Sequence, residues 1–290
     1  MPESSEVTLT TEILCKYLCG KKLTKVVFES GRYEKNHPEG FTSLEKKLPL
    51  KLADVNSKGK FIWFDFTYKK DGVKKHIYAW NTLGLFGLWT MYRPTSCRYK
   101  FVFEDSNRKK LTAYYSDRTS YGTLKFTTDK DALDSKLKKL GPDVLKEDFD
   151  LSKVSKYKTP IVKILMDQNK VISGVGNYLS VEALYKAKIS PHRIGSDLSD
   201  EEIENLTYAL KYIVKLAYTN NEIGYMVGLA DEGKNIKKIN YHPDIKLKKG
   251  IQFKFQVYQR DTDRHGNKIR ADKNLVKDRT TYWCPAVQKN

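Results

Sequence analysis

The sequence contains no long hydrophobic run and no sign of a secretory leader. Its longest mainly apolar stretch covers residues 77–89 and is interrupted by Asn81 and Thr82. A helix that crosses a membrane needs about 20 consecutive apolar residues. A signal peptide needs a basic segment followed by an apolar one, and the N-terminus lacks this order. We therefore expect a protein that neither spans a membrane nor is secreted.

Cysteine is scarce, and no two of the four cysteines are separated by the two-residue gap of a zinc ribbon or a redox pair. We therefore expect no disulfide framework, no zinc, no other metal and no cofactor. Cys15 and Cys19 are four residues apart in a helical stretch, which favours small buried hydrophobic side chains. This usage fits an intracellular, reducing compartment. The sequence does not distinguish the nucleus from a viral replication compartment.

Acidic residues are few relative to basic ones. The 290 residues include 53 Lys and Arg against 35 Asp and Glu, which gives a formal net charge of +18. Lysines are spread through segments with folded patterns and are not confined to a tail, so nucleic acid is the expected partner. Aromatic residues make up 12% of the chain, which indicates a folded protein, and the length suggests two domains.

The first half of the chain combines one helical pattern with many short strand patterns. The helical pattern covers residues 7–18, and the strand runs are rich in aromatic and β-branched residues, as is typical of an all-β sandwich. The runs are residues 26–28, 61–68, 75–80, 85–92, 99–103, 111–115 and 124–126. Residues 1–130 are therefore predicted to form a helix and β-sandwich domain within an α+β fold.

The second half begins with a charged connector, residues 131–156, and continues as a helical domain over residues 157–250. Its longest predicted helix opens with a capping box at residues 199–202. One face of this helix carries an apolar stripe, formed by Ile203, Leu206, Leu210, Ile213, Val214 and Ala217. The last segment, residues 251–290, returns to a strand pattern, with predicted strands at 253–258 and 280–283. We expect a β-hairpin finger there.

Pro2 and Glu3 are candidate catalytic residues. Removal of Met1 would expose the secondary α-amine of Pro2, and a reference pKa of about 7.7–8.0 leaves part of such an amine unprotonated at neutral pH. A secondary amine that attacks a sugar aldehyde carbon forms a cationic iminium ion, which is an electron sink for elimination. Glu3 is placed to move protons beside it. The simpler interpretation is an ordinary helix entry that suits a proline.

Three further segments carry side chains that suit phosphate. Lys60 follows Gly59 at the start of a predicted strand, where its ammonium group can hold a phosphate or donate a proton. Asn177 lies after a glycine-containing turn between two predicted helices, and helix starts bind phosphate without reading sequence. Arg279 offers a fork of N–H donors at the tip of the predicted hairpin. Each also has a structural interpretation: a solvated turn, a helix-packing unit and a surface arginine.

Taken in order, these segments resemble the Fpg/Nei family of DNA glycosylases. The motifs are the Pro-Glu start, the Gly-Lys step, Leu-Gly-Pro-Asp at residues 140–143, Gly-Val-Gly-Asn-Tyr-Leu at 174–179 and Arg-Thr-Thr-Tyr-Trp-Cys-Pro at 279–285. The resemblance runs from Pro2 to Gln288. It implies a β-sandwich catalytic domain, a helix–two-turn–helix domain and a finger hairpin. It also implies a monomer that acts on double-stranded DNA with oxidised bases or abasic sites.

The resemblance implies a role for each candidate residue. Pro2 would be the nucleophile that forms a Schiff base at C1′ of the deoxyribose, and Glu3 would be the general acid and base. Lys60 would assist base loss and β-elimination while contacting phosphate. Asn177 and Arg279 would clamp the phosphates beside the extruded nucleotide, and Arg279 would also donate the proton for δ-elimination.

The residues that would contact or replace the extruded nucleotide carry weaker matches. Lys139 is a further candidate for phosphate contact. A base inside a duplex is out of reach, so the family flips the nucleotide and fills the gap it leaves. By alignment, Leu85 stands in place of the usual methionine and Tyr121 in the aromatic wedge position. Arg118 lies one residue before the position of the family's intercalating arginine, where this chain has Thr119.

The finger departs from the family pattern. Of its two Cys-x-x-Cys pairs only Cys284 remains, and residues 263–269 replace the first pair. One cysteine with a lone His265 cannot hold zinc. We therefore expect the hairpin to be held by aromatic packing, through Phe255, Tyr258, Tyr282 and Trp283. The pattern resembles the zincless-finger, endonuclease VIII-like branch of animals and giant viruses, and the composition suits an AT-rich genome of the viral kind.

The resulting prediction is a bifunctional DNA glycosylase and abasic-site lyase of base excision repair that works by β,δ-elimination. Oxidised pyrimidines and hydantoins are the expected substrates, because zincless members of the family favour them. One alternative is a catalytically silent protein that recognises damaged or bent duplex DNA. Another is an RNA-binding module that stacks aromatic side chains on single strands.

Overall fold

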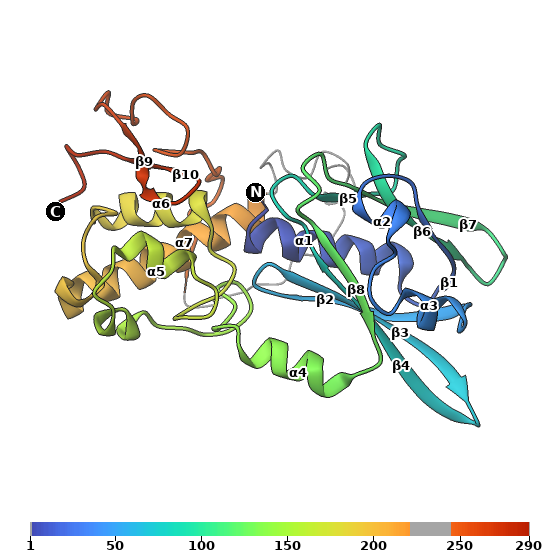
Figure 1. Ribbon diagram of the computed structural model, residues 1–290. Coiled ribbons are helices and arrows are strands. Elements are labelled where there is room, and N and C mark those ends of the chain that lie inside the picture. The colour runs from blue at the N-terminus through green and yellow to red at the C-terminus, as the bar shows by residue number, and fades with distance from the viewer. Residues whose placement is uncertain (1, 221–244, 290) are drawn as a thin grey trace. The chain divides into compact units, whose positions relative to one another are not determined.

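A computed structural model describes residues 2–220 and 245–289 (Figure 1). Of these, Pro2 and residues 6–137 form a first compact unit, and residues 3–5, 138–220 and 245–289 form a second. Met1, whose removal the sequence prediction requires, lies outside the described residues. So does the 221–244 part of the predicted 157–250 domain.

The first unit consists of one long helix, three short helices and an eight-stranded antiparallel sheet. The helices are α1 (Ser4–Leu18), α2 (Arg32–Lys35), α3 (Phe41–Glu45) and α4 (Lys130–Lys138). The strands are β1 (Lys22–Phe28), β2 (Leu50–Lys58), β3 (Phe61–Lys70), β4 (Val73–Thr82), β5 (Leu88–Thr90), β6 (Cys97–Glu104), β7 (Lys110–Ser116) and β8 (Thr123–Thr127). Their order in the sheet is β5-β7-β6-β1-β2-β3-β4-β8.

The sheet bends over itself to form the predicted sandwich. Phe64 of β3 and Phe101 of β6 are three strands apart in the sheet, which is about 14 Å at the usual strand spacing. Their ring centroids nevertheless lie 5.5 Å apart, and Trp89 of β5 packs against both rings. Such contacts require two sheet layers that face each other, so the predicted β-sandwich is confirmed.

A polar residue sits at the centre of this apolar core. Asn81 is fully buried, and its side-chain amide donates to the Tyr99 hydroxyl and to the carbonyl of Thr123. Its Oδ1 atom accepts a hydrogen bond from the Trp89 indole at 3.0 Å. Because a buried amide without partners is costly, this network fixes the register in which β4, β5 and β6 meet.

The second unit contains the predicted helices and a two-stranded hairpin. Its helices are α5 (Ile161–Met166), α6 (Asn177–Ala187) and α7 (Asp200–Asn220), with 3-10 turns at Ser152–Lys156 and Gly195–Asp197. The hairpin pairs β9 (Arg270–Val276) with β10 (Arg279–Trp283). Helices α6 and α7 lie side by side (Figure 1).

Helix α7 begins and packs as predicted. The Ser199 hydroxyl accepts a hydrogen bond from the Glu202 N–H, and the Glu202 carboxylate accepts one from the Ser199 N–H. This reciprocal pair is the predicted capping box. All six residues of the predicted apolar stripe are buried.

The α+β fold expected from the sequence is therefore confirmed. Within the described residues, no helix combines the length and apolar character that a membrane crossing needs.

The prediction of a strand over residues 253–258 is wrong. The N–H groups of Gln256, Val257 and Tyr258 donate to the carboxylate of Glu182 and are therefore not available to a strand ladder. The first strand of the hairpin is β9 instead. Its sequence is rich in charged residues, and its burial does not alternate along the strand. Periodicity could not identify it, because a strand exposed on both faces has no apolar period.

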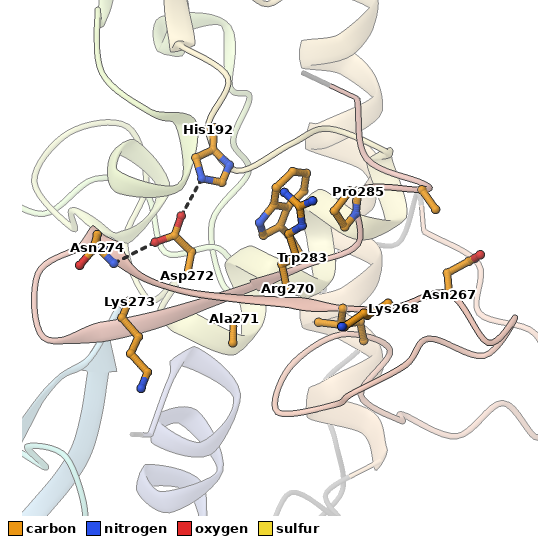
Figure 2. Close-up of a pocket in the computed structure, with 12 residues that line it drawn as sticks. His192, Asn267, Lys268, Arg270, Ala271, Asp272, Lys273, Asn274, Trp283 and Pro285 are labelled. Carbon is orange, nitrogen blue, oxygen red and sulfur yellow. Dashed lines mark hydrogen bonds and ion pairs between the residues drawn. The ribbon is translucent and has the colours of Figure 1, made fainter.

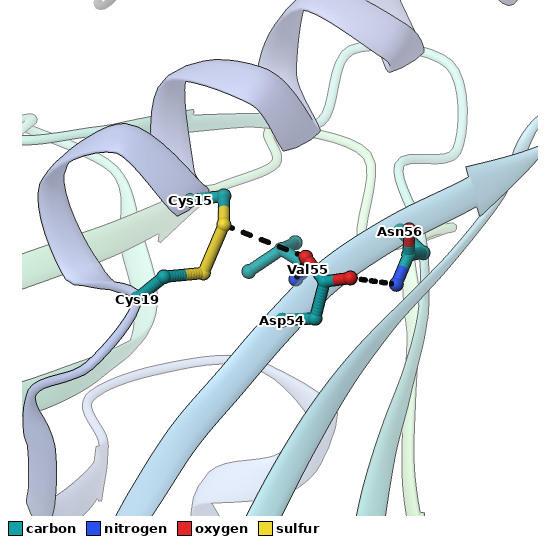
Figure 3. Close-up of a disulfide and its surroundings, with 5 residues drawn as sticks. All are labelled: Cys15, Cys19, Asp54, Val55 and Asn56. Carbon is teal, nitrogen blue, oxygen red and sulfur yellow. Dashed lines mark hydrogen bonds between the residues drawn. A yellow bond between two sulfur atoms is a disulfide. The ribbon is translucent and has the colours of Figure 1, made fainter.

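The prediction for Cys15 and Cys19 is also wrong. The two side chains are half-buried, not part of the core, and they are joined by a disulfide with a Cα–Cα distance of 4.7 Å (Figure 3). A spacing of four residues places both sulfur atoms on one side of the end of α1, so they can meet. The other two cysteines, Cys97 and Cys284, are free and buried.

Candidate functional site

Glu3 lies in a ring of backbone donors at the start of α6. Its carboxylate accepts hydrogen bonds from the N–H groups of Gly176 at 2.6 Å, Tyr178 at 2.9 Å and Leu179 at 3.2 Å. The side chain is 1% exposed. The first turn of a helix has unpaired N–H groups and a partial positive charge, and both stabilise an anion. The second unit therefore holds this carboxylate in one fixed orientation.

The turn before α6 holds the backbone of the same N-terminal residues. The Ser4 N–H donates to the carbonyl of Gly174, and the Ser4 hydroxyl donates to Asp143. Gly174 has a φ of 99°, a conformation that other residues rarely adopt. The Leu-Gly-Pro-Asp segment pairs with this turn, because Ser173 and Asp143 form a parallel bridge. Two motifs that are far apart in the sequence thus combine to position Glu3.

Asn177 and the hairpin that begins at Arg279 lie next to each other. The Asn177 amide donates to the carbonyl of Thr280 at 2.8 Å, and its buried Oδ1 atom has no hydrogen-bond partner among the described residues. Arg279 is half-buried and opens β10 directly after the Lys277–Asp278 turn, so it lies at the predicted hairpin tip. The structure therefore brings together Glu3, Asn177 and Arg279 around α6 and β10.

The remaining predicted site residues belong to other parts of the chain. Pro2 is buried and precedes α1, and Lys60 is half-buried in the turn that joins β2 to β3; both belong to the first unit. Gly59, beside Lys60, has a φ of 57°, which suits glycine in so tight a turn. Lys139 belongs to the second unit and is exposed just after α4.

Two surface loops of the first unit meet at Gly84 and Gly122. A Cβ atom on Gly84 would lie 2.6 Å from the Gly122 nitrogen, so the close approach requires glycine. The predicted residues Leu85 and Tyr121 lie on these loops, and Tyr121 is 64% exposed whereas Leu85 is half-buried. Phe86, which was not among the predicted site residues, is 56% exposed beside Leu85. An exposed aromatic ring of this size is the signal that identifies it.

The loop that carries Tyr121 is held by its backbone. The buried Asp117 carboxylate accepts hydrogen bonds from the N–H groups of Thr119 and Gly122. Arg98 donates to the carbonyls of Asp117 and Arg118, while Arg32 donates to the carbonyls of residues 120 and 122. The side chain of Arg118 is exposed. This anchoring fixes the loop while the exposed side chains of Arg118 and Tyr121 remain available to a ligand.

A carboxylate organises the finger within residues 263–269. Asp263 is 6% exposed and accepts hydrogen bonds from the Tyr185 hydroxyl, from the N–H groups of His265 and Asn267, and from the Asn267 amide. The Cys284 sulfur lies 3.8 Å from its Oδ2 atom. Although burial raises the pKa of Asp263, these hydrogen bonds outweigh it and hold the pKa far below its usual range.

These finger residues do not fit a zinc ion. The Asp263 oxygens are occupied by donors, and burial raises the pKa of the Cys284 thiol. An apolar cluster surrounds them and includes the predicted Tyr258 and Tyr282, whereas Phe255 packs on Tyr178. The cluster contains Val181, Tyr185, Val257, Ile269 and Cys284, with Tyr258, Tyr282 and Val287 packed against it. Packing and one carboxylate therefore hold the hairpin.

A cleft of about 980 Å³ lies beside the hairpin (Figure 2). The His192 ring bonds to the Asp272 carboxylate at 2.9 Å, and this contact lowers the pKa of Asp272. Trp283 packs edge-on against His192, 5.0 Å between ring centroids. Trp283, which was predicted to hold the hairpin by aromatic packing, thus packs on the loop after α6. None of the predicted site residues lines this cleft.

Family comparisons match the chain in three segments. Residues 1–124 match the N-terminal domain of formamidopyrimidine-DNA glycosylase, residues 140–227 match its H2TH domain, and residues 243–289 match its C-terminal domain. The segments follow the order of the motifs described above.

Relatives and solved structures match over the full length. A formamidopyrimidine-DNA glycosylase of Rickettsia bellii is 30% identical over 311 residues, and an endonuclease 8 of Pectobacterium carotovorum is 27% identical over 306 residues; both matches cover 100% of each chain. The fold is similar to that of the Lactococcus lactis Fpg protein in a complex with DNA that contains an oxidised pyrimidine. That match has a TM-score of 0.76, 22% identity and full coverage of both chains. A complex of the same Fpg protein with abasic-site DNA has a TM-score of 0.75 at 22% identity, covering 99% of this chain and 100% of that one.

Proposed function

Because this chain belongs to the Fpg/Nei family of DNA glycosylases, we propose that it is a bifunctional glycosylase and abasic-site lyase of base excision repair. Its substrate is double-stranded DNA with an oxidised base or an abasic site, and it acts as a monomer. The position of Glu3 supports this proposal most directly. A carboxylate held by three backbone N–H groups is a preorganised group for proton transfer.

In the proposed reaction, the secondary amine of Pro2 is the nucleophile once Met1 has been removed. The amine attacks C1′ of the damaged nucleotide, and the base leaves with the electrons of the glycosidic bond. The Glu3 carboxyl group donates a proton to the opening sugar and accepts the proton that the amine loses. The resulting iminium ion draws electrons from the sugar, so elimination cleaves the strand first at the 3′ phosphate and then at the 5′ phosphate.

Basic and amide side chains hold the phosphates in this proposal. Arg279 and Asn177 contact the phosphates beside the extruded nucleotide, and the Asn177 hydrogen bond to Thr280 supports their joint placement. Arg279 also protonates the leaving group of the δ-elimination. Lys60 assists base loss and β-elimination, and Lys139 adds a phosphate contact. These contacts act on the backbone, so they position the DNA without reading its sequence.

The extruded nucleotide leaves a gap in the duplex. We assign its filling to the two loops that meet at Gly84 and Gly122, because Phe86 and Tyr121 present exposed rings there. Leu85 is the neighbour of Phe86 on one of these loops, and in this proposal the exposed Arg118 of the other loop contacts the opposite strand. Oxidised pyrimidines and hydantoins are the proposed lesions. The finger functions without zinc, since Asp263 occupies its centre.

Borohydride trapping tests the proposed reaction. Protein with a native Pro2 terminus is incubated with duplex DNA that contains an abasic site or an oxidised pyrimidine, and borohydride then reduces the iminium ion to a stable amine. We expect covalent protein–DNA adducts for the wild type and few for Pro2→Gly. Glu3→Gln should lose excision of the oxidised base, whereas Glu45→Gln, a charge-matched change of an exposed residue on α3, should retain it.

The outcomes separate the competing functions. Binding of damaged duplex by native-ended protein without any trapping would refute the catalytic proposal and favour a silent DNA-binding protein. Mass spectrometry of the N-terminus confirms that the α-amine of Pro2 is free in the sample. Trapping by a variant that retains residues before Pro2 would show that another amine is the nucleophile.

A further inference from the structure

A second group of reactive side chains lies at the end of α1, separate from the residues of the proposed function. Cys15 and Cys19 lie there beside Asp54 of β2, and all three belong to the first unit (Figure 3). One potential ligand atom from each residue lies within 4.8 Å of the others. Across residues 2–220 and 245–289, no other trio of His, Cys, Asp or Glu side chains meets this spacing.

The Asp54 carboxylate is held facing the sulfur atoms. Its Oδ1 atom accepts a hydrogen bond from the Val55 N–H at 2.8 Å, and its Oδ2 atom accepts one from the Asn56 amide at 2.9 Å. Oδ1 lies 3.5 Å from the sulfur of Cys15. A disulfide sulfur carries no proton, so this approach gains nothing from hydrogen bonding while the disulfide is intact. Metal ligands are oriented by outer partners of this kind.

We propose that, once its disulfide is reduced, this group binds a thiophilic divalent ion such as Zn²⁺ through the sulfur atoms of Cys15 and Cys19 and the carboxylate of Asp54. Solvent completes the coordination. Zinc bonds of about 2.3 Å to sulfur and about 2.0 Å to oxygen in a tetrahedron place those two ligands about 3.5 Å apart. The observed distance between Cys15 Sγ and Asp54 Oδ1 is 3.5 Å.

The disulfide and the metal exclude each other. Two thiol reductant molecules reduce the Cys15–Cys19 bond by exchange; they supply two electrons and two protons and become a disulfide themselves. The ion then displaces a proton from each cysteine thiol and forms two metal–sulfur bonds. The sulfur atoms must separate to about 3.8 Å, which follows from the same tetrahedral geometry. The site is therefore available only in the reduced protein.

Exposure distinguishes these cysteines from the other two. Cys15 and Cys19 are half-buried, whereas Cys97 is 6% exposed and Cys284 is fully buried. Burial raises the pKa of Cys97 to about 12, so it remains a thiol at neutral pH. The site could not be predicted from the sequence, because the spacing is Cys-x₃-Cys and the third ligand lies 39 residues after Cys15.

Cadmium and zinc binding to the full-length protein tests the proposal. Cd²⁺ is added to reduced protein and the thiolate-to-cadmium charge-transfer absorption is measured; Zn²⁺ binding is measured by competition with a chromophoric chelator. We expect one ion per chain in reduced protein and none in oxidised protein. Cys15→Ser and Cys19→Ser should abolish the charge-transfer band, and Asp54→Asn should weaken Zn²⁺ binding by about tenfold or more.

Matched variants and the oxidised protein serve as controls. Asp71→Asn makes the same charge change in the exposed β3–β4 turn, where a φ of 52° suits asparagine, and Cys97→Ala removes a buried thiol. Both should bind like the wild type. If a cysteine variant fails to fold, the folded oxidised wild type still provides the metal-free comparison. Absence of uptake by reduced protein, or uptake unchanged by Cys15→Ser or Asp54→Asn, would overturn the site.

Discussion

The Asp263 carboxylate is the centre of the finger, and removing it should release the hairpin. Asp263→Ala deletes the acceptor of five hydrogen bonds, one of them the weak bond from the Cys284 thiol. The Tyr185 hydroxyl and the backbone N–H groups of His265 and Asn267 then lose their partner. An unpaired buried donor costs about 1–3 kcal/mol, so the total loss should be about 3–5 kcal/mol after partial hydration of the more exposed groups.

The isosteric change separates charge from shape. In Asp263→Asn, one oxygen can still accept from the His265 and Asn267 N–H groups, which both bond to Oδ1 in the wild type. The new NH₂ group faces the Tyr185 hydroxyl, which can rotate and accept. We expect a loss of about 1–2 kcal/mol, since only the charge assistance and the pairings of the Asn267 amide and the Cys284 thiol are removed. The predicted order of stability is wild type, then asparagine, then alanine.

Hydrogen exchange of the finger amides is the appropriate assay, because the hairpin can open without unfolding the whole chain. Amides of residues 263–283 should exchange roughly a hundredfold faster or more in Asp263→Ala, as follows from a loss of about 3 kcal/mol or more. Asp261→Asn, which removes a nearby exposed carboxylate, should leave them unchanged. Chelators should also leave them unchanged. Equal protection in Asp263→Ala and wild type would refute the reasoning.

The same carboxylate predicts a dependence on pH. The pKa of Asp263 is depressed in the folded protein, so its contribution is fully present above the unfolded-state pKa of about 3.9. That contribution is lost as the pH falls through the folded-state pKa. The difference in finger protection between wild type and Asp263→Asn should therefore be constant near neutral pH and shrink below about pH 4. A difference that grows toward acid pH would contradict this assignment.

Two further predictions concern DNA binding. Asn177→Ala removes the donor to the Thr280 carbonyl, so the affinity for abasic-site duplex should fall about tenfold in a fluorescence anisotropy titration. An unchanged affinity would exclude Asn177 from the interface. Phe86→Ala and Tyr121→Ala should each weaken the same binding by about 1–3 kcal/mol with little change in thermal unfolding, because both rings are exposed. Tyr208→Ala removes another exposed tyrosine and should leave DNA affinity unchanged. Equal losses of affinity in all three variants would point to a nonspecific effect.

Features with a short sequence period were predictable. The apolar stripe and capping box of α7 were read directly from spacing, and the structure confirms both. The strands that carry aromatic residues were found for the same reason, since β6 alternates buried and half-buried residues along its length. Asn177 and the Arg279 hairpin were located by resemblance, and the hydrogen bond to Thr280 adds the contact that relates them.

Contacts between distant residues were not predictable from these patterns. The Glu182 carboxylate accepts hydrogen bonds from the N–H groups of residues 256–258. Burial raises the pKa of Glu182 and outweighs these hydrogen bonds, which lower it. The pairing turns a segment with a strand-like sequence into an irregular one. The approach of Asp54 to the Cys15 sulfur, across 39 residues, is likewise a contact that no local pattern indicates. A local pattern reports the preference of a segment, and a buried carboxylate can override it by taking its backbone donors.

The finger shows how a carboxylate can hold a hairpin whose residues do not fit a zinc ion. A zinc ion bonds to four ligands and ties together segments that are distant in sequence. Asp263 does this with hydrogen bonds, since its donors come from α6, through Tyr185, and from its own turn, through His265 and Asn267. The two devices differ in what disrupts them: a chelator or oxidant removes a metal centre, whereas acid removes a carboxylate centre. A finger built on Asp263 should therefore keep its shape through chelation and oxidation and lose it only at low pH.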